Sequence, residues 1–185
     1  AEKVKCDKVI VDDYDSAIEA TTFLIKTGCK NIALFSSIDN LSVGKLRAKG
    51  YFEALSQNNI SSNSDIVILT ENQEDFDSKA KDILQNHDID GIFALDEHTA
   101  VMAMKMGLKM LKKIPEELAI IGFADGVWSR RLTPSLSTVS QHGPEIGEAA
   151  TRLLIERLEN KEEEYKYKTV VVKTELRQRD STRKM

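Results

Sequence analysis

The feature that most constrains the fold is an alternation of short apolar runs with longer amphipathic segments. The short runs are rich in β-branched and aliphatic residues, as strands buried on both faces are. They lie at residues 9–11, 32–35, 66–69, 91–95 and 119–122. Stretches with helical periodicity follow them at residues 15–27, 42–58, 76–87 and 99–112. Strands alternating with helices at this spacing predict a parallel α/β sheet covered by helices on both faces.

The ends and buried faces of several elements are also readable. Gly28 marks the end of the first helix, because glycine readily adopts the left-handed conformation that stops a helix. The helix at residues 42–58 is expected to bury Val43, Leu46, Phe52, Ala54 and Leu55. Residues 146–158 carry an apolar stripe, residues 169–172 predict a last strand, and residues 177–185 are expected to form a polar tail.

Composition sets the class of protein. With 185 residues, 41% of them hydrophobic and 30% charged, the chain is long enough for one sizeable domain or two small lobes. The net charge of −4 does not favour nucleic-acid binding by this segment, because phosphate contacts need a basic face. Cys6 and Cys29 lie in no metal-binding or disulfide pattern, which fits a reducing cytoplasm. No apolar run is long enough to span a membrane.

Enzyme motifs are missing from the sequence. It contains no glycine-rich phosphate-binding loop, no nucleophile-elbow motif and no zinc-protease motif. The three histidines are far apart and suggest no nucleophile–base pair. We therefore expect no catalysis, no cofactor and no metal ion.

Several ordered motifs resemble the LacI/GalR family of transcriptional regulators. They are EELAIIGFAD at residues 116–125, LTPSLSTVSQ at 132–141, IGEAA at 146–150, LRQRDST at 176–182, RAKGY at 47–51 and DGIFA at 90–94. Each motif is weak alone, but their order and spacing are specific. The resemblance extends from about Val9 to Thr182.

The resemblance implies a periplasmic-binding-protein-like fold: two Rossmann-like subdomains joined by three crossing connections. On this basis residues 1–12 are a remnant of the N-terminal subdomain and crossover, and residues 13–140 are the C-terminal effector-binding subdomain. Residues 141–162 are a helix returning to the N-terminal subdomain, and residues 163–185 are the final strand and tail. The chain is thus expected to be a partial fold, with a DNA-binding headpiece upstream of Ala1.

Arg47 and Asp96 are the first candidates for the effector site. Arg47 is either an exposed helical arginine or, as the resemblance implies, a residue whose guanidinium contacts the effector. Asp96 either caps the helix that follows it or accepts hydrogen bonds from ligand hydroxyls. The family pattern has Asn then Asp at this place, whereas this chain has Asp96 then Glu97.

Three further candidates follow from the resemblance. The family's effector-binding Asp falls on Ala124, so Asp125 either contacts a differently shaped ligand or is structural. Glu71 matches the family's cleft region, and Gln141 matches a glutamine at the subdomain crossover. For both, the alternative is a solvated loop residue.

The segment from Trp128 to Leu132 corresponds to a dimer interface of the family, and we assign Trp128, Arg131 and Leu132 to it. The alternative for Trp128 is stacking on a sugar ring. The basic residues Arg177 and Arg179 near the end are expected to be solvated rather than to bind nucleic acid.

The sequence therefore predicts the effector-binding and dimerisation region of a LacI/GalR-like regulator. The effector is expected to be a sugar or small metabolite, and operator DNA is expected to bind through the headpiece. A soluble sugar-binding protein of a transport system is the alternative. The expected assembly is a cytoplasmic homodimer that does not contact a membrane.

Overall fold

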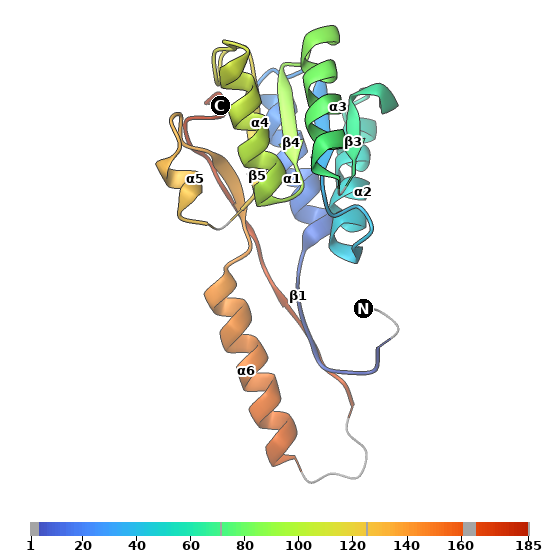
Figure 1. Ribbon diagram of the computed structural model, residues 1–185. Helices are drawn as coiled ribbons and strands as arrows, with labels where there is room; N and C mark the ends of the chain where they lie inside the picture. The colour runs from blue at the N-terminus through green and yellow to red at the C-terminus, as the bar shows by residue number, and fades with distance from the viewer. Residues whose placement is uncertain (1–3, 71, 125, 161–165, 185) are drawn as a thin grey trace.

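A six-stranded sheet with helices on both faces forms the body of the protein (Figure 1). The structure is a computed structural model that describes residues 4–70, 72–124, 126–160 and 166–184. The strands of the sheet are β2 (Ile32–Ser36), β3 (Val67–Leu69), β4 (Gly91–Ala94), β5 (Ala119–Phe123), β6 (Ser137–Ser140) and β8 (Glu175–Arg177). The helices are α1 (Asp13–Lys26), α2 (Ser42–Gln57), α3 (Gln73–Asn86), α4 (Glu97–Lys109), α5 (Trp128–Arg131) and α6 (Gly143–Glu159), with a 3₁₀ turn η1 (Ser64–Ile66).

The sheet confirms the predicted parallel α/β fold. Its strand order is β3-β2-β4-β5-β6-β8, and every pairing is parallel except that of β6 with β8. One core lies between the sheet and α1 with α2, and the other lies between the sheet and α3 with α4. Because helices cover both faces, β2, β4 and β5 are buried along their whole length, as continuous apolar strands require.

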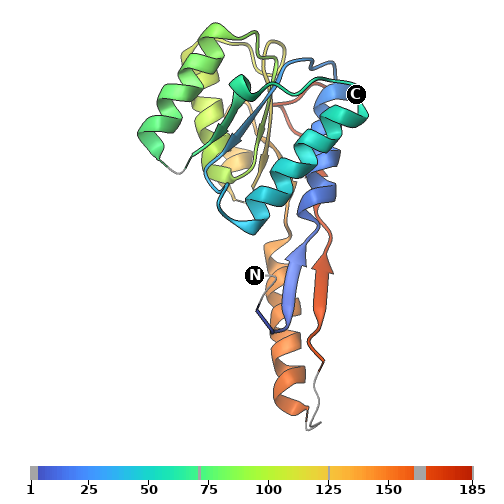
Figure 2. The same ribbon diagram turned by 90° about the vertical axis from the view of Figure 1, so that its right-hand side faces the viewer.

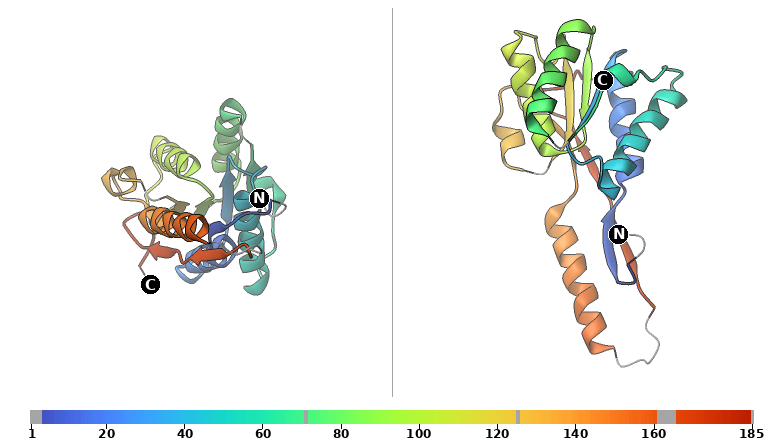
Figure 3. Two further views of the ribbon diagram at one scale, coloured as in Figure 1. Left: turned by 90° about the horizontal axis from the view of Figure 1, so that it is seen from below. Right: turned by 45° about the vertical axis from the view of Figure 1, so that its right-hand side comes forward.

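A slender arm projects from one end of this body (Figures 2 and 3). It consists of β1 (Lys8–Val11), which pairs in parallel with β7 (Thr169–Val172), and of α6, which packs on that pair. Leu153 is the buried side chain of α6, while Leu154 and Leu158 of its apolar stripe are exposed, as is Ile155 beside the stripe. Three short connections, after β1, β6 and β7, join the arm to the body.

The buried face of α2 differs from the prediction. Ala54 and Leu55 are buried as expected, but Leu46 and Phe52 are 41% and 38% exposed. The inward face instead carries Gly44, Arg47, Gly50 and Tyr51. The reason is close packing on α1: a Cβ at Gly50 would lie 2.7 Å from the Cβ of Ala17, so only glycine permits this approach.

The prediction that residues 177–185 form a polar tail is also wrong. Residues 175–177 form β8, and Ser181 and Thr182 are fully or almost fully buried. The Ser181 Oγ donates to the Ile120 carbonyl at 2.6 Å and accepts from the Ser137 N–H at 2.8 Å. Short polar side chains therefore attach the end of the chain to β5 and β6 by hydrogen bonds. An apolar pattern in the sequence cannot reveal such a structural role.

The two cysteines differ sharply in environment, which gives a simple prediction. Cys6 is exposed and Cys29 is buried. Burial, together with the charge of Asp90, raises the pKa of the Cys29 thiol to about 11. At about pH 7 only roughly one thiol in ten thousand would be the reactive thiolate. Iodoacetamide should therefore label Cys6 quickly and Cys29 only after unfolding, as peptide mass spectrometry would reveal. The Cys6→Ser variant is the control, and rapid labelling of Cys29 in the folded chain would contradict the prediction.

Candidate functional site

Arg47 lies across the carboxyl end of the sheet, where its side chain joins four elements. Its Nε donates to the Asp13 Oδ1 at 2.7 Å, its Nη1 to the Leu95 carbonyl at 2.7 Å, and its Nη2 to the Gln141 Oε1 at 3.0 Å. The guanidinium carbon lies 3.8 Å from the centre of the Phe123 ring, a favourable cation–π distance. The guanidinium thus connects the start of α1, the ends of β4 and β5, and the residue after β6.

The Arg47–Asp13 ion pair is almost completely withdrawn from water. The two side chains are 5% and 3% exposed. Burial lowers the pKa of Arg47, against the opposing influence of Asp13 and Asp96. Burial likewise raises the pKa of Asp13, against the influence of Arg47. Since each charge would be costly alone in this setting, the pair requires both partners.

Asp96 caps α4, which was one of its two predicted roles. Its Oδ1 accepts from the Thr99 N–H at 2.8 Å, and its Oδ2 accepts from the N–H and hydroxyl of Ser37 at 3.0 and 3.1 Å. The carboxylate therefore ties the loop after β2 to the start of α4. The side chain remains half-buried at the same edge as Arg47, and its contact with an effector stays a prediction.

The other predicted effector residues fall into two groups. Gln141 meets Arg47 and is not a solvated loop residue. Glu71 and Asp125 lie outside the described residues. The site thus brings together Arg47, Asp96 and Gln141 of the predicted set, at the strand ends where α/β proteins bind ligands.

The predicted dimer-interface residues lie on α5 and directly after it. Trp128 is 63% exposed at the start of α5, and Arg131 is exposed at its end. Leu132 is half-buried because it packs against the core on the α3–α4 side of the sheet. Contact with a partner subunit and stacking on a sugar ring both stay predictions for Trp128.

Sequence reasoning missed Asp13, the Leu95 carbonyl and Phe123. The carbonyl has no signature in a sequence, and Phe123 entered the sequence analysis only as part of the EELAIIGFAD motif at residues 116–125. For Asp13 a signal existed: Gly44, Arg47 and Gly50 recur every third residue, so they share a face of α2. A charged residue between two glycines on an inward face indicates a buried partner on the neighbouring helix.

A second contact joins two of the connections to the arm. The Asp12 Oδ1 accepts from the Thr174 N–H at 2.9 Å, and the Asp12 Oδ2 lies 3.0 Å from the Lys173 Nζ. Burial alone would raise the pKa of Asp12, but these two partners hold that pKa below its usual value. Asp12 therefore links the connection after β1 to the one after β7, beside the Asp13–Arg47 pair.

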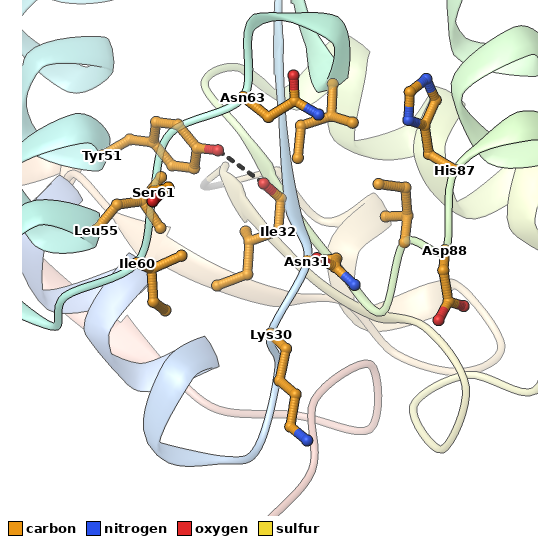
Figure 4. Close-up of a pocket in the computed structure, with 12 residues that line it drawn as sticks. Lys30, Asn31, Ile32, Tyr51, Leu55, Ile60, Ser61, Asn63, His87 and Asp88 are labelled. Atoms are coloured by element: carbon orange, nitrogen blue, oxygen red, sulfur yellow. Dashed lines mark hydrogen bonds between the residues drawn. The ribbon is translucent and has the colours of Figure 1, made fainter.

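The hollow drawn in Figure 4 lies at the opposite edge of the sheet, where β2 begins. It measures about 330 Å³ and is lined by apolar residues, such as Leu55 and Ile60, and by polar ones, such as Asn31 and His87. The buried Tyr51 hydroxyl donates to the Ile32 carbonyl at 2.7 Å in its wall. Because ligands of parallel α/β sheets bind at the carboxyl ends of the strands, this hollow is not the candidate site.

Features of other functional classes are missing from the described part of the chain. Within it, no three His, Cys, Asp or Glu side chains lie close enough together to hold a metal ion. Of the described helices, none combines the length and apolar character that crossing a bilayer requires.

The parallel sheet, the polar strand-end edge and the short connections to an arm are together typical of ligand-binding α/β proteins. A family model described as periplasmic binding protein-like domain matches residues 21–182. The chain belongs to this family, in the form that LacI-type transcriptional regulators carry.

Individual relatives agree with this assignment. The ribose operon repressor of Halalkalibacterium halodurans is 34% identical over 168 residues, which cover 89% of this chain and 49% of the repressor. A LacI family transcriptional regulator from Enterococcus faecium, solved with bound ribose, superposes with a TM-score of 0.81 at 26% identity over 95% of this chain and 65% of its own. The CelR–cellobiose complex has the same fold, with a TM-score of 0.86 at 24% identity over 96% of this chain and 54% of its own. The chain spans about half the length of the curated relatives that it matches.

Proposed function

We propose that this chain forms the effector-binding and dimerisation region of a LacI-type transcriptional repressor. The observation that best supports this proposal is the buried guanidinium of Arg47. It lies at the carboxyl ends of the strands and donates hydrogen bonds to Asp13 and Gln141. The effector would be a sugar or another small metabolite, as expected for a protein similar to a ribose operon repressor. The quoted relatives are repressors and regulators, so a transport protein or an enzyme is not the favoured assignment.

The geometry supports a mechanism that couples effector binding to operator binding. Asp13 begins α1 directly after the connection from β1, and Gln141 begins the connection from β6 to α6. A ligand that repositions Arg47 therefore acts on both connections at once, and through them on the arm. Coupling of this kind is typically worth about 1–3 kcal/mol, which changes the affinity for a second ligand about 5–150-fold. The second ligand here is operator DNA, bound by the upstream headpiece.

Two measurements test the proposal. Isothermal titration of the complete gene product with ribose, cellobiose, maltose and sucrose should reveal at least one that binds. The complete gene product should shift DNA from its own promoter region in a gel, and the sugar that binds should change the shift. Failure of the complete product to bind its own promoter would refute the regulator, whatever the sugar result.

The dimer surface is a separate part of the proposal. Trp128 presents most of its side chain on α5, and the neighbouring Val127 is also exposed. Large aromatic side chains dominate the centres of interfaces, so a charge at Trp128 should be poorly tolerated there. We expect Trp128→Glu to be a monomer in analytical ultracentrifugation, whereas the wild type and Trp128→Tyr are dimers. A Trp128→Glu chain that stays dimeric would exclude Trp128 from the interface.

A further inference from the structure

We infer that Asp13 sets the charge class of the ligand: it neutralises Arg47 so that this edge accepts an uncharged polyhydroxyl molecule and excludes phosphorylated or carboxylated ones. The inference rests on the proposed effector site. An arginine at a ligand-binding edge ordinarily favours anions, because its planar fork grips phosphate or carboxylate with two parallel bonds. The surroundings of Arg47 prevent this.

The first reason is geometric. A guanidinium has five N–H groups, and Nε carries one of them. That one donates to Asp13, so an anion cannot take the side of the fork formed by Nε and Nη2. Nη1 and Nη2 each already have a protein acceptor, Leu95 and Gln141. Phe123 covers one flat face of the group. Two N–H groups remain for a ligand, one on Nη1 and one on Nη2, and a hydroxyl oxygen can accept from either of them.

The second reason is the balance of charge. The carboxylates whose charges act on Arg47 are Asp13 and Asp96. Asp96 accepts from three donors, as an ionised carboxylate does. One guanidinium facing two carboxylates leaves a net negative charge on these described groups. An incoming anion would meet repulsion in a poorly solvated setting, whereas a hydroxyl can donate to one carboxylate and accept from Arg47.

A substitution that keeps shape and removes charge separates these effects from packing. In Asp13→Asn the side-chain oxygen can still accept from the Arg47 Nε, but the guanidinium is no longer neutralised. Asp12→Asn is the matched control. It removes the same charge from the neighbouring residue, whose partners are Thr174 and Lys173 and not Arg47.

The probe is inorganic phosphate, titrated calorimetrically and followed by thermal unfolding, since a ligand at about 100 times its dissociation constant stabilises the folded chain measurably. We expect weak or no binding by the wild type and by Asp12→Asn, and at least about tenfold tighter binding by Asp13→Asn, that is, a gain of about 1.4 kcal/mol. If Asp13→Asn does not fold, Asp96→Asn is used, because asparagine also caps helices well and removes the other carboxylate. It should gain phosphate affinity in the same way.

Two results would overturn the inference. One is wild-type binding of phosphate as tight as that of the Asp13→Asn or Asp96→Asn chain. The other is an equal gain in Asp12→Asn, which would indicate a general effect of net charge. Both are distinct from failure of the proposed function, which depends on neutral sugars and promoter DNA and not on phosphate.

Discussion

Replacing Arg47 with alanine is expected to destabilise the chain by about 3–5 kcal/mol, because it leaves the carboxylate of Asp13 buried without a partner. The Leu95 carbonyl and the Gln141 side chain lose a donor at the same time. Urea unfolding would measure the loss. Lys45→Ala, an exposed substitution two residues earlier on α2, is the control and should stay within about 0.5 kcal/mol of the wild type.

The double variant Asp13→Ala/Arg47→Ala makes the same prediction sharper. Removing both charges relieves the unpaired carboxylate, so the double variant should be more stable than the sum of the two single effects predicts. Additive losses would mean that the two side chains are not energetically coupled in solution.

The Arg47→Ala variant would also separate stability from sensing. In the complete gene product, Arg47→Ala should lose its response to sugar and keep operator binding. Lost DNA binding with an intact sugar response would contradict the role assigned to Arg47.

Removing the end of the chain is expected to have the second large effect. A chain that stops at Gln178 loses Arg179, whose Nη1 donates to the Leu136 carbonyl at 2.6 Å, and the Ser181 bridge between β5 and β6. Several buried polar groups of the sheet are then left without partners, at about 1–3 kcal/mol each. We expect no cooperative unfolding transition by circular dichroism for this truncated chain.

Ser181→Ala tests the same contact with a single atom. The Ser137 N–H loses its acceptor inside the sheet, which should cost about 1–3 kcal/mol in urea unfolding. Lys184→Ala, on an exposed side chain at the same chain end, serves as the control and should be neutral. A truncated chain as stable as the wild type would restore the view of this segment as a solvated tail.

Where a segment carried a periodic apolar signal, the sequence predicted the type and position of the element correctly, although not always its buried face, as α2 shows. The apolar runs correctly indicated the positions of β2, β4 and β5, and the amphipathic stretches those of helices α1 to α4. Gly28 follows the end of α1 in the left-handed conformation, with a φ of +97°, as expected. The missed elements lack that signal. β6 consists of Ser, Thr, Val and Ser, and β8 of Glu, Leu and Arg, so neither stands out from a loop. Their pairing depends on the neighbouring strand, which local sequence does not contain.

The amino-acid sequence alone determined the fold class, the order of the main elements and the family, because burial of apolar residues on regular strands and helices leaves a periodic pattern. It also placed Arg47, Asp96 and Gln141 among the candidates, through the family resemblance. The tertiary structure decided that Arg47 points inward, that Asp13 neutralises it, and that the chain end closes the sheet. These depend on which distant groups meet in a low-dielectric interior, where a hydrogen bond or a charge pair is worth far more than in water.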